Sequence, residues 1–185
     1  MSLRQLNPVL VALLVSLPAS AHTADETPQI PGPAPEHAFL KRFVGEWTTE
    51  SQCQMGPDQP AMPCQGKFNA RMLGDFWLIS DTEGSMAGAS VHAVLTLGYD
   101  PQQQKYVGTW VDSMMNHLWK YEGAVEGEKL ILEASGPNLL AGGRPALFRD
   151  IYEFKSADEI AVSSQMQTED GAWVTFITGT ARRKP

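Results

Sequence analysis

Residues Tyr106–Gly123 read YVGTWVDSMMNHLWKYEG, in which two runs of alternating side chains flank a short, polar and Met-rich segment. Alternation over short runs is typical of β-strands, and a brief polar connection between two of them is typical of a hairpin. The sequence therefore predicts an antiparallel pair of strands at Lys105–Asp112 and His117–Val125.

This pair of strands carries the first candidate site. Successive side chains point to opposite faces of a strand, so Trp110 and Asp112 share one face. For the same reason His117, Trp119 and Tyr121 share one face of the partner strand. If both faces point inward, an inward His117 beside Asp112 could act as a general base or orient a polar ligand. The alternative is a histidine whose ring nitrogens are satisfied by nearby backbone or carboxylate groups.

The same strand pattern continues through the chain after Gly45. Turn residues such as Gly74-Asp75 and Asp100-Pro101 interrupt it at short intervals. About ten short strands joined by hairpins describe an up-and-down meander, which avoids exposed edges by closing on itself. We therefore predict an all-β fold, a single antiparallel β-barrel with room for a small ligand. The expected strands are Glu46–Cys53, Gly66–Leu73, Phe76–Glu83, His92–Tyr99, Lys105–Asp112, His117–Val125, Lys129–Ala134, Leu147–Phe154, Glu159–Met166 and Trp173–Arg182.

One short helix is expected before the first strand. Pro35 suits a helix start, and Phe39, Leu40 and Phe43 fall on one face at helical spacing. A helix with one apolar face must cover something, and in an otherwise all-β chain it would cap the mouth of the barrel.

The beginning of the chain has the features of a cleavable secretory signal. Arg4 supplies a positive start, Val9–Leu17 a short apolar core and Pro18–Ala21 a small-residue cleavage site, which predicts cleavage before His22. The apolar core is far shorter than the roughly 20 residues that span a membrane. We therefore expect export, to the periplasm or out of the cell. The expected organisation is a signal peptide at residues 1–21, a disordered Pro-rich leader at 22–35 and the barrel domain at 36–185.

The cysteine and charge content of the chain indicates a disulfide and disfavours a metal site or a nucleic-acid partner. Cys53 and Cys64, the only cysteines, bracket a turn-rich segment, which in an exported chain favours a disulfide. A metal site would need further His or Cys ligands nearby, and we expect none. Removing residues 1–21 takes away Arg4, one of 14 basic residues, and leaves 13 against 21 acidic residues, a net charge of −8. A nucleic-acid partner is therefore not expected.

The start and end of the expected barrel resemble lipocalins and their calycin relatives. In those barrels a short helix precedes a Gly-x-Trp sequence, the Trp seals the base, and an Arg from the last strand lies across its ring. Gly45-Glu46-Trp47 matches the Gly-x-Trp sequence here. The resemblance implies a stacked pair of Trp47 and Arg182.

More closely, the chain from His37 to Lys184 resembles an uncharacterised bacterial family, domain of unknown function fifteen-seventy-nine. The resemblance implies a lipocalin-like barrel and no particular activity, since none is established for that family. The segments that carry it are His37–Trp47, Cys53–Pro57, Leu97–Pro101, Gly108–Trp110, Ser113–Met115, His117–Trp119, Tyr121–Gly123, Arg149-Asp150 and Glu153.

A second candidate group is Arg149 with Glu153, four residues apart on one face of an expected strand. If that face is interior, Arg149 is an anion anchor of the kind that fatty-acid-type barrels use, and Glu153 tunes it. If it is exterior, Phe148 and Tyr152 fill the core instead, and the two charges are a solvated pair of little energetic value.

Three classes of function remain compatible with these features. The leading one is a non-catalytic barrel, without a cofactor, that binds a small and partly apolar molecule in the cell envelope. The second is an isomerase or hydrolase that uses Asp112 and His117, although no Gly-x-Ser-x-Gly motif or reactive cysteine is present. The third is haem binding, as in nitrobindin-type relatives, against which all four histidines lie before the last third of the chain. The oligomeric state is left open.

Overall fold

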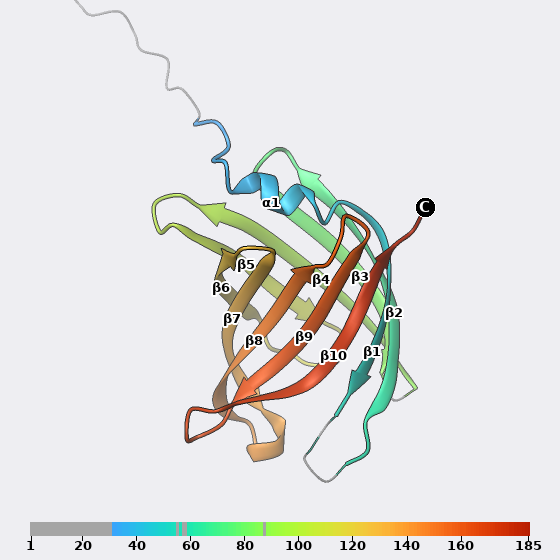
Figure 1. Cartoon of the computed structure of the whole chain (residues 1–185). Coiled ribbons are helices and arrows are strands. Elements are labelled where there is room, and N and C mark those ends of the chain that lie inside the picture. The colour runs from blue at the N-terminus through green and yellow to red at the C-terminus, as the bar shows by residue number, and fades with distance from the viewer. Residues whose placement is uncertain (1–30, 55, 57–58, 87) are drawn as a thin grey trace, which may run out of the picture. The chain divides into compact units, whose positions relative to one another are not determined.

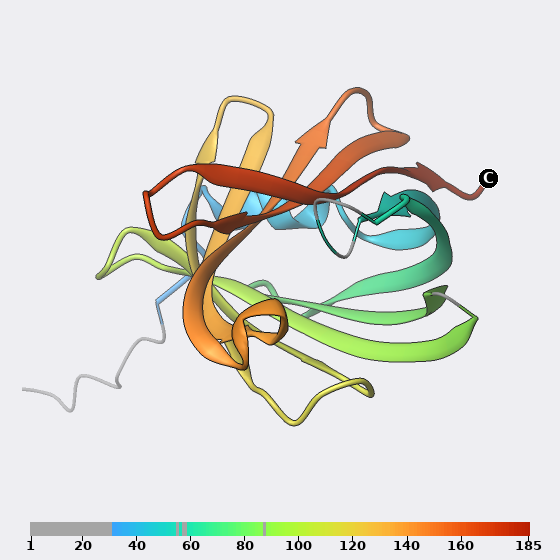
Figure 2. The same cartoon turned by 90° about the horizontal axis from the view of Figure 1, so that it is seen from below.

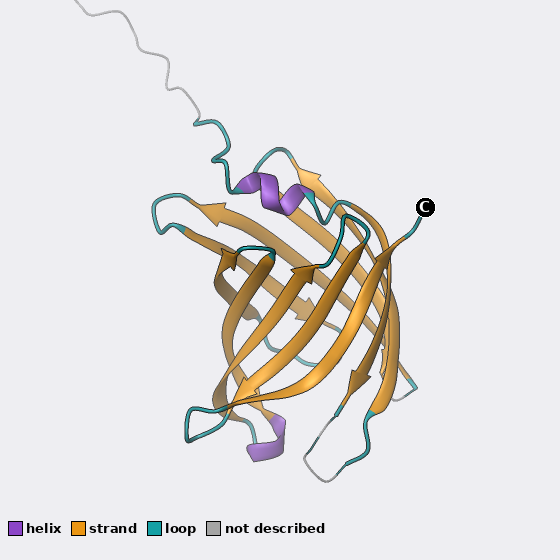
Figure 3. Ribbon diagram, viewed as in Figure 1, coloured by secondary structure: helices purple, strands orange, loops and turns teal. Residues whose placement is uncertain are grey.

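The computed structural model describes residues 31–54, 56, 59–86 and 88–185, and its ten antiparallel strands form one closed barrel (Figure 1). The all-β prediction is confirmed. A short helix, α1 (His37–Lys41), precedes the barrel, and a 3-10 turn, η1 (Leu139–Ala141), interrupts one connection (Figure 3). The strands are β1 (Gly45–Cys53), β2 (Met62–Leu73), β3 (Trp77–Met86), β4 (Ala89–Asp100), β5 (Lys105–Asp112), β6 (Trp119–Glu126), β7 (Lys129–Asn138), β8 (Arg144–Phe154), β9 (Glu159–Gln167) and β10 (Trp173–Arg183).

Each strand pairs with its neighbours in sequence, and β1 closes the sheet by pairing with β10. In such a meander the connections alternate between the two ends of the barrel. The α1 end therefore holds the β2–β3, β4–β5, β6–β7 and β8–β9 turns, and the opposite end holds η1 and the remaining connections. Figure 2 views the barrel from that opposite end, with α1 on the far side.

The predicted start of one strand is wrong. His117 and Leu118 lie in the connection before β6, which begins at Trp119. The Asp112 carboxylate explains the longer connection, because its Oδ1 accepts the backbone N–H groups of Met114 and Met115 at 2.8 and 3.1 Å. An aspartate that caps the chain in this way favours a turn over a continued strand.

The α1 end is closed by packed aromatic and apolar side chains. Leu40 and Trp47 are fully buried, and the indole N–H of Trp47 donates to the carbonyl oxygen of Phe43 at 2.8 Å. Phe43 packs edge-on against Phe154, with ring centroids 4.9 Å apart. The helix thus caps this end of the barrel, as its apolar face predicts.

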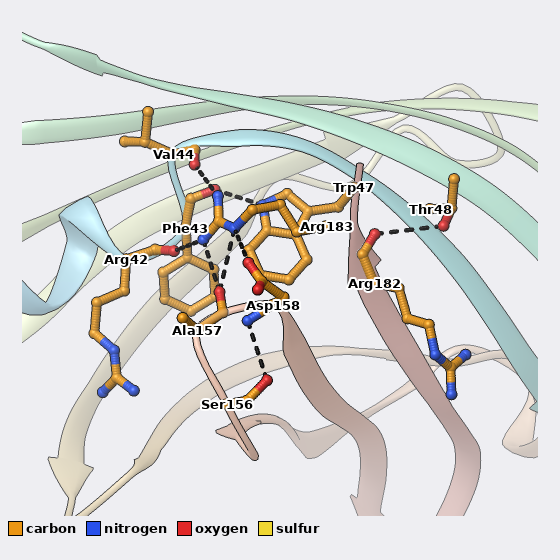
Figure 4. A network of polar contacts seen from close by, with 10 residues as sticks. All are labelled: Arg42, Phe43, Val44, Trp47, Thr48, Ser156, Ala157, Asp158, Arg182 and Arg183. Atoms are coloured by element: carbon orange, nitrogen blue, oxygen red, sulfur yellow. Dashed lines mark hydrogen bonds and ion pairs between the residues drawn. The ribbon is translucent and has the colours of Figure 1, made fainter. Parts of the chain in front are cut away.

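Arg183, and not the expected Arg182, lies across Trp47 (Figure 4). Its guanidinium carbon is 4.2 Å from the centroid of the Trp47 ring. Strand alternation is the reason: Arg183 is the register partner of Trp47 and follows the buried Ala181 on the inner face. Arg182 points outward, within 3.5 Å of Glu159 and 3.9 Å of Glu50.

Cys53 and Cys64 form a disulfide, as predicted, which joins the end of β1 to β2 away from α1. The expected signal peptide, residues 1–21, and most of the expected leader, residues 22–35, lie outside the described residues. Among the helices that the structure describes, none is long and apolar enough to cross a membrane.

Candidate functional site

The inner faces of the strands surround a cavity of about 180 Å³. Most of its wall is apolar, formed by side chains such as Leu78, Leu95, Val162 and Ile177. Such walls follow from the alternation of each strand, which turns every second residue inward. The cavity equals the volume of about six water molecules at liquid density, so it suits a small molecule.

A buried polar cluster interrupts this apolar wall. Asp150 lies in the middle of β8 and lines the cavity. The hydroxyl of Tyr121 on β6 donates to Oδ2 of Asp150. The hydroxyl of Ser164 on β9, the register partner of Asp150, donates to Oδ1 at 2.5 Å. Three strands therefore hold this carboxyl group in one orientation.

Burial controls the acid–base properties of the cluster. It raises the pKa of Asp150, because a charged carboxylate loses its hydration inside the barrel. The hydrogen bonds from Ser164 and Tyr121 act in the opposite direction and offset part of this effect. Burial, followed by the charge of Asp150, raises the pKa of the Tyr121 and Tyr152 hydroxyls, which therefore stay protonated at neutral pH.

The remaining polar groups of the wall are hydroxyls. Ser80 and Thr82 on β3 and Thr49 and Ser51 on β1 line the cavity. Among the described residues that line it, none is a lysine, arginine or histidine. Asp150 is thus the only ionisable carboxyl group of that described wall, and no positive side chain there balances it.

Three predicted site residues lie on the inner face as expected. Trp110 lines the cavity, Tyr121 is buried, and Trp119 packs against the hydrophobic core. The Trp119 ring meets Phe148 edge-on at 5.1 Å, and Phe148 in turn meets Phe176 at 6.1 Å. Because Phe148 precedes Asp150 on the inner face of β8, this aromatic layer lies between the polar cluster and the end opposite α1. A ligand-binding role for these residues stays a prediction.

The predicted pair of Asp112 and His117 is not assembled. Asp112 Oδ2 accepts the indole N–H of Trp110 at 3.0 Å, while its Oδ1 caps the following turn. His117 Nε2 lies 3.2 Å from the carbonyl oxygen of Ser135, and its ring packs edge-on against Trp119. Within the described residues, no hydrogen bond joins the two side chains. His117 therefore resembles the alternative considered from sequence, a histidine satisfied by backbone.

Arg149 and Glu153 do not belong to the barrel interior, and their assignment to it is wrong. Strand alternation turns them away from Asp150 and Tyr152, which line the cavity. Arg149 donates to Gln165 Oε1 at 2.5 Å, and its guanidinium carbon lies 4.0 Å from the centroid of the Trp173 ring. Glu153 pairs with Lys155 at 2.7 Å on the outer surface. The anion anchor is therefore absent from the described part of the cavity wall.

Sequence reasoning missed the central residue of the site. Asp150 alternates with Phe148, Tyr152 and Phe154, so an acid stands on a strand face that is otherwise aromatic. That pattern was the available signal. The sequence contained no such signal for Ser164 and Ser80, because a serine on a short strand fits either face.

A model of the family described as "Protein of unknown function (DUF1579)" matches residues 32–183. The chain belongs to this family. The DUF1579 match spans α1 and all ten strands, so the cavity and its polar cluster lie entirely within the family domain. No curated protein sequence matches the chain.

Solved structures with a similar fold are distant in sequence. Rv2717c from M. tuberculosis is 14% identical, with a TM-score of 0.57, over 83% of this chain and 100% of the other. The S-type phycobiliprotein lyase CPES from Guillardia theta is also 14% identical, with a TM-score of 0.56, over 81% of this chain and 93% of the other. At this identity the likeness establishes the barrel fold alone.

Proposed function

We propose that this DUF1579 protein is a non-catalytic barrel that binds a small, partly apolar molecule in its cavity. One observation carries the proposal: a buried polar cluster, Asp150 with Tyr121 and Ser164, stands in an otherwise apolar cavity. Apolar walls with a few fixed polar groups are the usual anatomy of small-molecule sites. A barrel that needed only stability would gain little from a buried acid.

The packing of the α1 end favours entry of a ligand from the opposite end of the barrel. The α1 end is sealed by Trp47 and the residues around it. At the opposite end, large apolar side chains are exposed on the connections and strand ends. They are Met114, Leu118, Leu139, Leu140 and Val174. None of these five side chains lines the cavity, and Leu73 and Trp77 are exposed in the same way at the α1 end, so the packed α1 end alone supports this route.

The compartment that fits this function is the cell envelope or the outside of the cell. The disulfide between Cys53 and Cys64 is compatible with an oxidising environment, and the signal-like residues 1–21 supply a route of export. An envelope location would expose the protein to small molecules that cross or enter the periplasm.

The alternative functions receive less support from the site. Asp112 and His117 do not form the pair that a hydrolase or isomerase would need. Haem ligation inside the barrel would need a lining histidine. His37 instead bonds to the carbonyl oxygen of Ala34, and His92 lies beside Ser90 outside the cavity. Neither alternative rests on an assembled group of side chains among the described residues.

Native mass spectrometry of the protein purified from the envelope of its own host tests the proposal. We expect a discrete mass excess that disappears when the same sample is denatured. A Ser80→Leu variant should lose that excess, because the larger leucine side chain would fill part of the cavity that Ser80 lines. A Ser85→Leu variant is the matched control, since Ser85 is exposed on the same strand. A bare polypeptide mass across several growth conditions would contradict the proposal.

A further inference from the structure

We propose that the molecule bound in the cavity is a small amine, held as its cation with the ammonium group on Asp150. This inference rests on the proposed function and adds the chemical class of the ligand. Its basis is the charge of the cavity: a half-buried carboxyl group faces the cavity, and no lysine, arginine or histidine lines the described part of the wall.

The geometry of Asp150 leaves room for a ligand donor. Tyr121 donates one hydrogen bond to Oδ2, and Ser164 donates one to Oδ1. Each carboxylate oxygen can accept two hydrogen bonds, so one acceptor position on each oxygen stays available. The two hydroxyl groups fix the carboxyl group while it faces the cavity, which is the preorganisation that ligand binding rewards.

A cationic ligand also supplies the counter-charge that the Asp150 carboxylate lacks. Burying a carboxylate without a counter-charge is costly, and a charge-assisted hydrogen bond from an ammonium group offsets that cost. The same burial that raises the pKa of free Asp150 therefore favours a positively charged ligand. A ligand carboxylate would instead be repelled by Asp150, because no described residue of the wall is positively charged and Arg149 faces outward.

The surrounding wall suits the rest of an aromatic or short alkyl amine. The rings of Trp110, Tyr152 and Phe68 line the same cavity, and aromatic faces attract ammonium groups. The indole N–H of Trp110 is held by Asp112 at 3.0 Å, which fixes the orientation of that ring. The volume of about 180 Å³ limits the apolar part to one ring or a short chain.

Three probes of nearly equal size, benzylamine, benzyl alcohol and benzoate, show whether the cavity prefers a cation, a neutral molecule or an anion. Their affinities would be measured by isothermal titration calorimetry at neutral pH, where an alkylamine is protonated. The protein is the form purified from the envelope, dialysed free of any bound molecule. The indole N–H signal of Trp110 in NMR spectra, assigned with a Trp110→Phe variant, reports whether a probe enters the cavity.

We expect benzylamine to bind at least about tenfold more tightly than benzyl alcohol, and benzoate to bind most weakly. Asp150→Asn keeps the size of the side chain and removes its charge, so it should abolish the preference for the amine. Glu153→Gln removes one charge from the outer face of the same strand and should leave the preference intact. Tyr121→Phe, which keeps the Asp150 charge, should weaken amine binding and leaves a test if the asparagine variant does not fold.

The outcomes distinguish this inference from the proposed function. If benzyl alcohol or benzoate shifts the Trp110 signal and binds as tightly as benzylamine, the cavity binds small molecules but the amine assignment is wrong. An amine preference that survives in Asp150→Asn also overturns the assignment. If no probe binds and the envelope protein carries no mass excess, both the inference and the proposed function fail.

Discussion

The carboxyl group of Asp150, which lines the cavity, gives the folded protein a distinctive response to pH. Its pKa in the folded state is raised by burial above the unfolded value of about 3.9. Between these two values the folded state binds a proton that the unfolded state has lost. The stability contributed by this group is therefore highest below the unfolded pKa, falls as the pH rises through the window, and stays lower above it.

Replacing Asp150 by Asn should remove this dependence. The free energy of unfolding of Asp150→Asn, relative to that of the original protein, should rise as the pH increases from about 4 toward neutrality. Urea unfolding at a series of pH values measures this difference. Glu153→Gln is the control with the opposite sign, because the hydrogen bond from Lys155 lowers the pKa of Glu153. Its relative stability should fall only as the pH rises toward the unfolded pKa of about 4.3, and stay level above it. A flat difference for Asp150→Asn would contradict the burial argument.

Two adjacent arginines at the end of β10, Arg182 and Arg183, differ in the contacts that their side chains make. Arg183 stacks on Trp47 and donates to the carbonyl oxygens of Val44, Arg42 and Ala157 at 2.5 to 3.2 Å (Figure 4). Arg182 has only exposed ion pairs.

We therefore expect Arg183→Ala to lower the free energy of unfolding by about 2 to 3 kcal/mol. Arg182→Ala should change it by less than about 0.5 kcal/mol. Chemical denaturation of both variants is the measurement. Arg183→Lys should recover only part of the loss, because a lysine cannot reach several acceptors with one planar group. Equal losses for the two alanine variants would show that the stacking on Trp47 does not stabilise the barrel.

At the scale of elements, the disulfide holds β1 and β2 together where their connection is long. Cys53 and Cys64 are 11 residues apart, and Cys53 is buried. Replacing both by serine should cost about 2 to 3 kcal/mol of stability, because the unfolded chain is no longer constrained. Thermal unfolding with and without reductant measures the effect, and the oxidised protein should contain no free thiol. A reductant effect that persists in the double serine variant would assign the change to something other than this bond.

The aromatic layer near the end opposite α1 depends on a glycine in β7. A Cβ atom at Gly136 would collide with the ring of Trp119. Gly136→Ala should therefore displace Trp119 from Phe148 and cost roughly 1 to 3 kcal/mol. Near-UV circular dichroism and urea unfolding report the two effects. Gly127→Ala is a poor control, because Gly127 has a φ of 61°. Ala146→Val on β8 tests instead whether any added bulk near this end has the same effect.

At the scale of the whole molecule, the expected export signal predicts where the mature chain begins. We expect the protein recovered from the envelope to begin at His22, because the small residues before it match the cleavage pattern. Intact-mass measurement of periplasmic and cytoplasmic fractions tests this. A chain that keeps residues 1–21 and stays in the cytoplasm would contradict the expected compartment, and the barrel and its cavity would be unaffected.

The sequence by itself determined the elements of this protein. Alternation in segments such as Lys105–Asp112, with turn residues between them, predicted ten strands. Apolar residues at helical spacing predicted the capping helix, and two cysteines in a chain with an expected export signal predicted the Cys53–Cys64 disulfide. These features depend on local preferences and on short connections, which are written in neighbouring residues. The period of two also placed Trp110 with Asp112, and Trp119 with Tyr121, on shared strand faces, but which of those faces points inward came from the folded barrel.

Only the tertiary structure decided which groups meet. The sequence left open which face of β8 carries Arg149, and closure of the barrel turned it outward with Glu153. A shift of one residue exchanges the two faces of a strand, which is also why Arg183 and not Arg182 covers Trp47. The cluster of Asp150, Tyr121 and Ser164 joins the strands β6, β8 and β9, and the sequence of any one strand does not indicate a contact between strands.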